Sequence, residues 1–87
     1  MVRLADGERK RSLAEIQSNE NVRIRSILFS MLRDLCRDLG IEEGDEVVCR
    51  KASSAVLILN ARGRTVVLER DLARFIEVTG PAGKQTT

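Results

Sequence analysis

The sequence contains no histidine, no tryptophan and no tyrosine, and only two cysteines and two phenylalanines among its 87 residues. Without histidine, a Ser-His-Asp triad, a Cys-His dyad and a histidine-ligated zinc or haem are excluded. Two cysteines cannot supply a four-thiolate metal site within one chain. A catalyst built on carboxylates, lysine or cysteine stays open, but it needs a cleft. The composition therefore favours a binding protein, and we predict no catalytic residue and no cofactor.

Long apolar runs and nucleotide-binding glycine motifs are also missing. No segment approaches the roughly 18 apolar residues of a membrane span. Residues 1–8 lack the apolar core of a secretory signal. Neither G-x-x-x-x-G-K-[ST] nor G-x-G-x-x-G occurs. The two cysteines, at positions 36 and 49, form no disulfide framework, so reduced thiols and a cytoplasmic location are expected.

The small positive charge belongs to the ends of the chain. The formal net charge is +2, but residues 12–78 carry ten basic and eleven acidic side chains. Residues 1–11 show no hydrophobic periodicity, and residues 79–87 are rich in glycine and threonine around Pro81. We therefore expect a flexible N-terminal arm (1–11), one folded domain (12–78) and a flexible C-terminal tail (79–87). A near-neutral domain argues against nucleic-acid binding.

The first half of the domain changes its hydrophobic period near residue 28. Ser12 and Glu15 fit a capping box before a single helical turn, 13–16. Residues 22–27 alternate apolar and polar, as in a half-buried strand. An amphipathic helix of about ten residues then follows, with Ser30 as its cap and Gly40 at its end. Its apolar face has spacings of four, three and four, with Met31 beside it, and comprises Leu28, Leu32, Leu35 and Leu39.

The second half of the domain has the sequence pattern of β-strands. Residues 46–50, 55–59 and 64–68 are rich in β-branched and large apolar side chains and predict a three-strand meander. A short helical turn (69–73) and a last strand (75–78) follow. Five short strands and one helix indicate a mainly β fold with one helix, a small partly open β-barrel. Exposed strand edges in such a barrel also allow weak self-association.

The ordered series of segments from about Ser12 to Val78 resembles the FeoA family of small proteins associated with bacterial ferrous iron transport. The segments that carry the resemblance are Leu13–Ile16, Val22–Arg25, Leu35–Ile41, Glu43–Val47 and Gly63–Val78. The resemblance implies an SH3-like barrel, cytoplasmic and non-enzymatic. It also implies a partner, the membrane GTPase transporter FeoB, which would hold the protein at the membrane periphery. The domain is also similar to the C-terminal SH3-like domain of DtxR-type iron-dependent repressors, so a regulatory role in transcription is the alternative function.

A binding module acts through its surface, and two groups of side chains are candidates for partner binding. The apolar candidates lie about the start of the helix, with core packing as the alternative; they are Leu28, Phe29 and Met31. The charged candidates, with ordinary solvated charge as the alternative, are Arg33, Arg37, Arg62 and Arg64, together with Arg70 and Arg74.

Three further features of the sequence bear on its function. A group of five carboxylates offers oxygen ligands for a hard cation, although its spacing fits no ligand loop; it comprises Asp38, Glu42, Glu43, Asp45 and Glu46. Cys36 and Cys49 are either a thiol pair or ordinary small core residues. The turn from Leu39 to Val47 also looks like that of AbrB-type DNA-binding dimers. The neutral domain and its extension through Val78 argue against that last reading. We therefore predict no metal site and no nucleic-acid partner.

Overall fold

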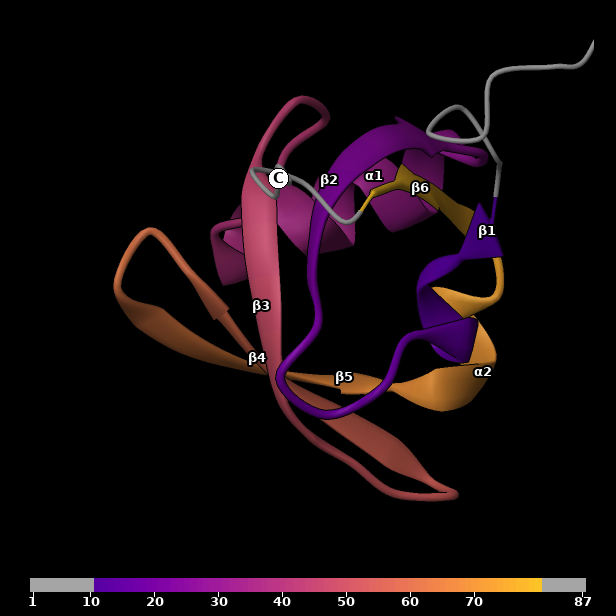
Figure 1. The fold of residues 1–87 in the computed structure, drawn as a ribbon. Coiled ribbons are helices and arrows are strands. Elements are labelled where there is room, and N and C mark those ends of the chain that lie inside the picture. The colour runs from indigo at the N-terminus through magenta and orange to yellow at the C-terminus, as the bar shows by residue number, and fades with distance from the viewer. Residues whose placement is uncertain (1–10, 81–87) are drawn as a thin grey trace, which may run out of the picture.

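The computed structural model describes residues 11–80, so most of the predicted flexible arm (1–11) and tail (79–87) lies outside the described residues. Thr79, which the sequence assigned to the tail, pairs with Arg23 in the sheet. Arg11, which the sequence assigned to the arm, pairs with Val78 at the start of the domain. Figure 1 shows the elements in chain order: β1 (Arg11–Ser12), η2 (Leu13–Glu15), β2 (Asn21–Ile27), α1 (Ser30–Leu39), β3 (Glu46–Ala52), β4 (Val56–Ala61), β5 (Arg64–Glu69), α2 (Arg70–Ala73) and β6 (Ile76–Thr79).

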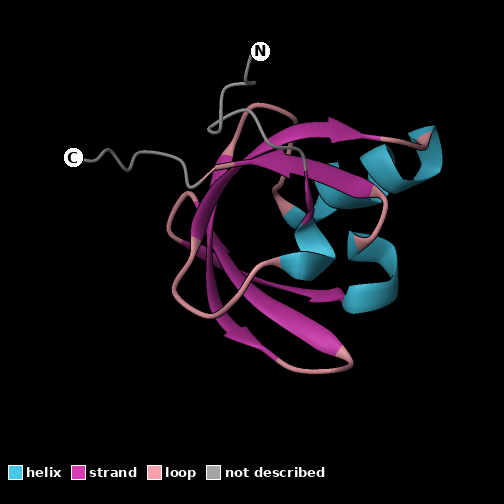
Figure 2. Cartoon of the chain, turned by 45° about the vertical axis from the view of Figure 1, so that its right-hand side comes forward, coloured by secondary structure: helices cyan, strands magenta, loops and turns pink. Residues whose placement is uncertain are grey.

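The strands form one antiparallel sheet in the order β1-β6-β2-β3-β4-β5. Strand β2 pairs with β3 along its first residues and with β6 along its last, so the sheet bends around it. Register shifts in β2 and in β3 sharpen the bend. The sheet curls into a barrel without closing, and the helical segments gather at one side of it (Figure 2). The predicted mainly β, partly open SH3-like barrel is confirmed, with the two-residue β1 as the strand that the sequence reading missed.

The core fills the inside of this curled sheet. On β4 and β5 the inward side chains alternate as a half-buried sheet requires, and Leu57, Leu59, Val66 and Leu68 are each no more than 3% exposed. The other walls contribute buried aliphatic side chains from β2, β3, β6 and η2. All buried side chains are apolar within residues 11–80. The fold is therefore held by apolar burial in a thin core.

The helix α1 presents a different face to this core from the one predicted. Its buried residues are Leu32 and Cys36, and Leu39 is only partly buried. Met31 and Leu35, which the sequence placed on the apolar face, point away and are exposed. The apolar stripe is wider than the surface that the sheet can cover, so the sheet buries one side of it.

Of the two predictions for the ends of α1, the one for its start is wrong and the one for its end is confirmed. Ser30 is the first helical residue and not the cap; the N-cap is Phe29, whose side chain accepts no capping hydrogen bond. Gly40 ends the helix in the left-handed conformation at φ 99°, as predicted. Its N–H donates to the carbonyl oxygen of Arg37 at 3.0 Å.

The opening of the barrel lies between its two edge strands, β1 and β5, and the short helices η2 and α2 lie side by side there (Figure 1). Arg70, at the start of α2, joins the parts of the chain that meet at this opening. Its guanidinium donates to the carbonyl oxygen of Ala14 in η2 and, at 2.7 Å, to that of Ser53 in the β3–β4 turn. Arg70 is therefore a structural link between η2, α2 and the β3–β4 turn.

The β4–β5 hairpin turns through only two residues, Arg62 and Gly63, both with positive φ (56° and 79°). This is the type I′ geometry that matches the twist of a hairpin. Among residues 11–80, a methyl group at Gly63 would meet nothing within 4 Å, so a substitution there tests backbone conformation alone. Arg62 takes the left-handed conformation although it is not glycine, and its guanidinium pairs with the Asp45 carboxylate at 2.8 Å.

We expect Gly63→Ala to lower the free energy of unfolding by about 1 kcal/mol, because alanine resists positive φ. Gly63→Asn should lose less, since asparagine tolerates the left-handed region. Urea denaturation of the full chain measures both variants against the wild type. If both variants lower the free energy of unfolding equally, the positive φ at position 63 is not what determines the stability of this turn.

Candidate functional surface

Four large apolar side chains that the core does not cover gather at the end of β2 and the start of α1. Leu28, Phe29 and Met31 are 55, 53 and 81% exposed, and Phe75, just before β6, is 39% exposed. We call these four residues the apolar patch. The structure places the three predicted apolar candidates on the surface rather than in the core.

The apolar patch is held together by two contacts between segments far apart in the sequence. The rings of Phe29 and Phe75 pack edge to face, with centroids 5.2 Å apart and planes at 67°. The Leu28 N–H donates to the carbonyl oxygen of Phe75 at 3.1 Å. Leu35 lies one turn after Met31 on α1, is 40% exposed, and extends the apolar surface along the helix. The two aromatic side chains therefore lie against each other at the surface.

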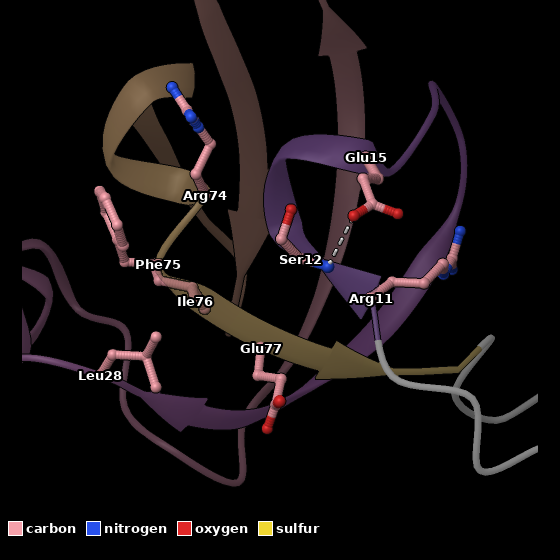
Figure 3. A pocket seen from close by; sticks show the side chains of 8 residues that line it. All are labelled: Arg11, Ser12, Glu15, Leu28, Arg74, Phe75, Ile76 and Glu77. Carbon is pink, nitrogen blue, oxygen red and sulfur yellow. Dashed lines mark hydrogen bonds between the residues drawn. The ribbon is translucent and has the colours of Figure 1, made fainter.

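A shallow hollow of about 230 Å³ adjoins the apolar patch (Figure 3). Leu28 and Phe75 lie at one end of it and Arg11 and Glu15 at the other, with Ile76 between them (Figure 3). The rest of its lining is Ser12, Arg74 and Glu77. The hollow has an apolar end and a polar end, so it suits an apolar or aromatic side chain of a partner.

Arg33 and Arg37, both on α1, differ in what holds them. The Arg33 guanidinium donates to the carbonyl oxygen of Ile27 at 3.2 Å and lies 3.8 Å from the Glu43 carboxylate. Among residues 11–80, Arg37 pairs only with Asp34, at 3.4 Å on the same helix, and is largely solvent-exposed. Arg33 is thus anchored to the end of β2, whereas Arg37 is an ordinary surface charge.

Arg62 and Arg64 lie away from the apolar patch, at the tip of the β4–β5 hairpin. The Arg64 guanidinium covers Gly40, where an added Cβ would come within 3.4 Å of Arg64 Nη1. The hairpin tip therefore meets α1 at its C-terminal end, and the apolar patch is at its other end. A ten-residue helix spans about 15 Å. The structure arranges the predicted residues along α1 in two groups rather than in one site.

The carboxylates considered as a cation site are largely engaged in other bonds. The Glu43 carboxylate accepts from the Ile27 N–H at 2.8 Å, and the Asp45 carboxylate accepts from the Glu42 N–H and from Arg62, both at 2.8 Å. Glu46 pairs with Arg23 at 2.7 Å. Within residues 11–80 no group of three or more metal-type ligands converges. These acidic side chains hold the turn between α1 and β3.

Cys36 and Cys49 are both fully buried within the core. Burial raises the pKa of both thiols; at Cys49 a backbone hydrogen bond and the charge of Arg70 offset part of the rise. Because only the thiolate is nucleophilic, both cysteines are chemically quiet in the folded state. The surroundings are those of small core residues.

We therefore expect Ellman's reagent at pH 8 to modify neither cysteine appreciably in the native chain, and both within minutes in 6 M guanidinium. The native rate should be at least about a hundredfold lower than that of the unfolded chain, because modification requires opening of the core. Rapid modification of one cysteine in the native state would contradict the burial shown here.

Phe75 is the residue of the apolar patch that sequence reasoning missed, because it was assigned to the last strand. The strand begins one residue later, and Ile76 and Val78 occupy its buried face. Period-two alternation puts Phe75 on the opposite side from Ile76. That alternation was a usable signal that Phe75 faces outward.

Comparisons with known proteins place this fold. A model of the FeoA domain matches residues 11–80, which is more than half of the chain. The crystal structure of an iron uptake regulatory protein (FeoA) shares 18% identity and a TM-score of 0.74 over 80% of this chain and 95% of that chain. A FeoA-like protein from Clostridium acetobutylicum shares 22% identity and a TM-score of 0.75 over 90% of this chain and 94% of that chain.

A different kind of protein contains a similar fold. The T. acidophilum IdeR structure gives a TM-score of 0.72 at 16% identity, over 91% of this chain but only 36% of that chain. No curated protein matches the chain. In residues 11–80 no helix is long and apolar enough to cross a membrane. At these identities the structural neighbours show the fold alone.

Proposed function

The chain belongs to the FeoA domain family, and on that basis we propose that it is a small cytoplasmic accessory protein of ferrous iron transport that binds a FeoB-type membrane GTPase transporter. Membership of the family implies a small protein associated with iron transport. The transporter as partner, and a position at the membrane periphery through that partner, are the proposed steps beyond it. The protein acts by binding rather than by catalysis.

The apolar patch is the observation that carries this proposal. A small soluble domain gains nothing for its own stability by exposing Phe29 and Met31 to water, and clustered exposed apolar side chains mark interaction surfaces. Protein interfaces are enriched in aromatic residues, methionine and arginine. The apolar patch supplies the first two kinds, and the adjacent hollow accepts an anchoring side chain from the partner.

The arginines have secondary roles in this proposal. Arg33 and Arg37 follow α1 away from the apolar patch and form a polar rim along the same helix. Arg62 and Arg64, at the far end of α1, contact the partner only if it extends along the whole helix. We therefore expect the apolar patch to determine the dissociation rate and the arginines to affect the salt dependence of association.

Isothermal titration of the full chain into the cytosolic part of the transporter tests the proposal. We expect saturable binding with a dissociation constant in the micromolar range and a negative heat-capacity change, because apolar surface is buried. Titration with the transporter in detergent checks whether membrane-embedded parts contribute. No binding at a few hundred micromolar in either form would reject the transporter as partner.

A regulatory role is the second candidate, favoured by the structural similarity to T. acidophilum IdeR. The chain covers 36% of that protein, so the similarity concerns one part of it. Residues 11–80 carry equal numbers of basic and acidic side chains, which gives no electrostatic drive toward DNA. A gel shift at low salt that weakens steeply as salt is added would favour this role over the first.

A further inference from the structure

The sheet has two edges, and they are unlike each other. β1 contains two residues, whereas β5 runs over six, from Arg64 to Glu69, without proline, lysine or a register shift. Within the described chain no strand pairs with the outer side of β5. Natural proteins usually place a proline, a lysine or a β-bulge on a long edge strand, because these features prevent another strand from pairing with it. The charged residues of β5, Arg64 and Glu69, lie at its two ends, so its centre is left available for pairing.

The main-chain groups that face outward along β5 follow from the hairpin. Ala61 and Arg64, the pair that flanks the two-residue turn, bond to each other through their main-chain N–H and C=O groups. Every second pair of residues along the hairpin does the same. The Arg70 N–H donates to the carbonyl oxygen of Ala55 at 2.9 Å, which continues the same alternation. The intervening residues, Thr65, Val67 and Glu69, therefore direct their main-chain groups away from β4.

Val67 also ends an apolar row on the outer face of the sheet. It is 56% exposed, it lies opposite the half-buried Ile58 of β4, and Ile58 lies opposite Lys51 of β3. The row stops at the free edge, so one side of the Val67 side chain has no neighbour in the sheet. A strand added at that edge would cover it with its own side chain.

We propose that β5 pairs antiparallel with β5 of a second copy of this chain, about a two-fold axis through Val67. In this register Val67 faces Val67 of the other copy, and Thr65 faces the Glu69 carboxylate. Each outward N–H of one copy donates to an outward carbonyl oxygen of the other. On the outer face, Ile58 and Val67 of one copy then continue into Val67 and Ile58 of the other, as one apolar row. None of the residues of the apolar patch takes part, so this pairing is compatible with the proposed partner.

The self-complementarity of β5 is what selects a second copy over an unrelated peptide. An isologous interface requires the same patch to match itself under the two-fold axis. Here the apolar residue lies at the centre, and a hydroxyl faces a carboxylate on either side. The inward residues Val66 and Leu68 already belong to the core, so they neither help nor hinder. The contact is small, and the dimer is accordingly weak.

Cross-linking of the full-length chain with Val67→Cys tests the register. Residues opposite each other in a hydrogen-bonded pair have Cα atoms about 5.5 Å apart, which suits a disulfide. Cys36 and Cys49 are fully buried and do not compete. Mild oxidation should give a covalent dimer on a non-reducing gel. Thr65→Cys is the matched control, because its two copies would lie about 13 Å apart, too far to bridge.

Sedimentation equilibrium of the chain without added cysteines gives an independent measurement. Val67→Lys places like charges opposite each other at the axis and should weaken dimerisation by at least about tenfold. Met31→Lys makes the same change on the apolar patch and should leave the dimer unchanged. A dimer that Val67→Lys leaves intact, or cross-linking that is as efficient from position 65 as from 67, would overturn the proposal, as would a chain that stays monomeric at millimolar concentration.

Discussion

The double variant Phe29→Ser/Met31→Ser is expected to lose about 30- to 100-fold in affinity for the FeoB-type transporter while keeping its fold. Both side chains are more than half exposed, so they contribute little to the core. Truncating interface residues of these kinds costs about 2–2.8 kcal/mol when they are central to a contact. At about 1.4 kcal/mol per factor of ten, that loss corresponds to the stated range.

The effect on stability should be small because two contributions oppose each other. Phe29→Ser removes the edge-to-face contact with Phe75, worth about 0.5–1.5 kcal/mol. Phe29 is also the N-cap of α1 and provides no capping bond, whereas serine is a good N-cap residue worth about 1 kcal/mol. Thermal unfolding should therefore stay within a few degrees of the wild type.

The matched control for this variant is Val67→Thr. Val67 is about as exposed as Phe29 but lies on β5, outside the apolar patch, and threonine keeps the β-branched shape. We expect wild-type affinity for the transporter. If both variants bind as the wild type does, the apolar patch is not the binding surface; if both lose affinity equally, the partner recognises the molecule more broadly.

The arrangement of elements was predictable from the sequence because most of it follows from local signals. The meander, Gly40 as the end of α1 and the helical turn before the last strand each depend on residues close in the chain. The wrong predictions concern long-range packing. Which side of the wide apolar stripe of α1 is buried depends on how the sheet curls beneath it, so Leu35 is exposed where burial was expected, and Cys36 lies in the core beside Leu32.

The candidate surface was predictable only in part, for the same reason. Phe29 and Met31 could be named from a run of apolar residues at the start of a helix. That Phe75, 46 positions later, packs edge to face against Phe29 depends on the pairing of β2 with β6. Arginines are harder still, since Arg33, Arg64 and Arg70 look alike in the sequence. One is anchored to β2, one covers a glycine, and one bridges the barrel opening.

Arg70→Ala is expected to produce the largest loss of stability among single surface changes in this domain, about 2 kcal/mol. The guanidinium donates to the carbonyl oxygens of Ala14 and Ser53, and hydrogen bonds from a charged donor contribute about 1.5–3 kcal/mol each. The bond to Ser53 is exposed, so water replaces part of it after substitution. For a domain of this size, 2 kcal/mol corresponds to a melting temperature lower by roughly 10 °C.

Two further variants separate the bridging role of Arg70 from its charge. Arg70→Lys keeps the charge but cannot reach two carbonyl groups with a planar fork, so it should recover less than half of the loss. Arg74→Ala removes an arginine of the same region whose only ion pair within residues 11–80, to Asp71 at 3.9 Å, is exposed. This variant should change the free energy of unfolding by less than about 0.5 kcal/mol.

Equal losses of stability for Arg70→Ala and Arg74→Ala would mean that the barrel opening is held by the packing of η2 on α2 and not by the arginine bridge. A loss confined to Arg70, with the amides of η2 exchanging faster than those of β4, would show that this one side chain keeps the two ends of an unclosed sheet together.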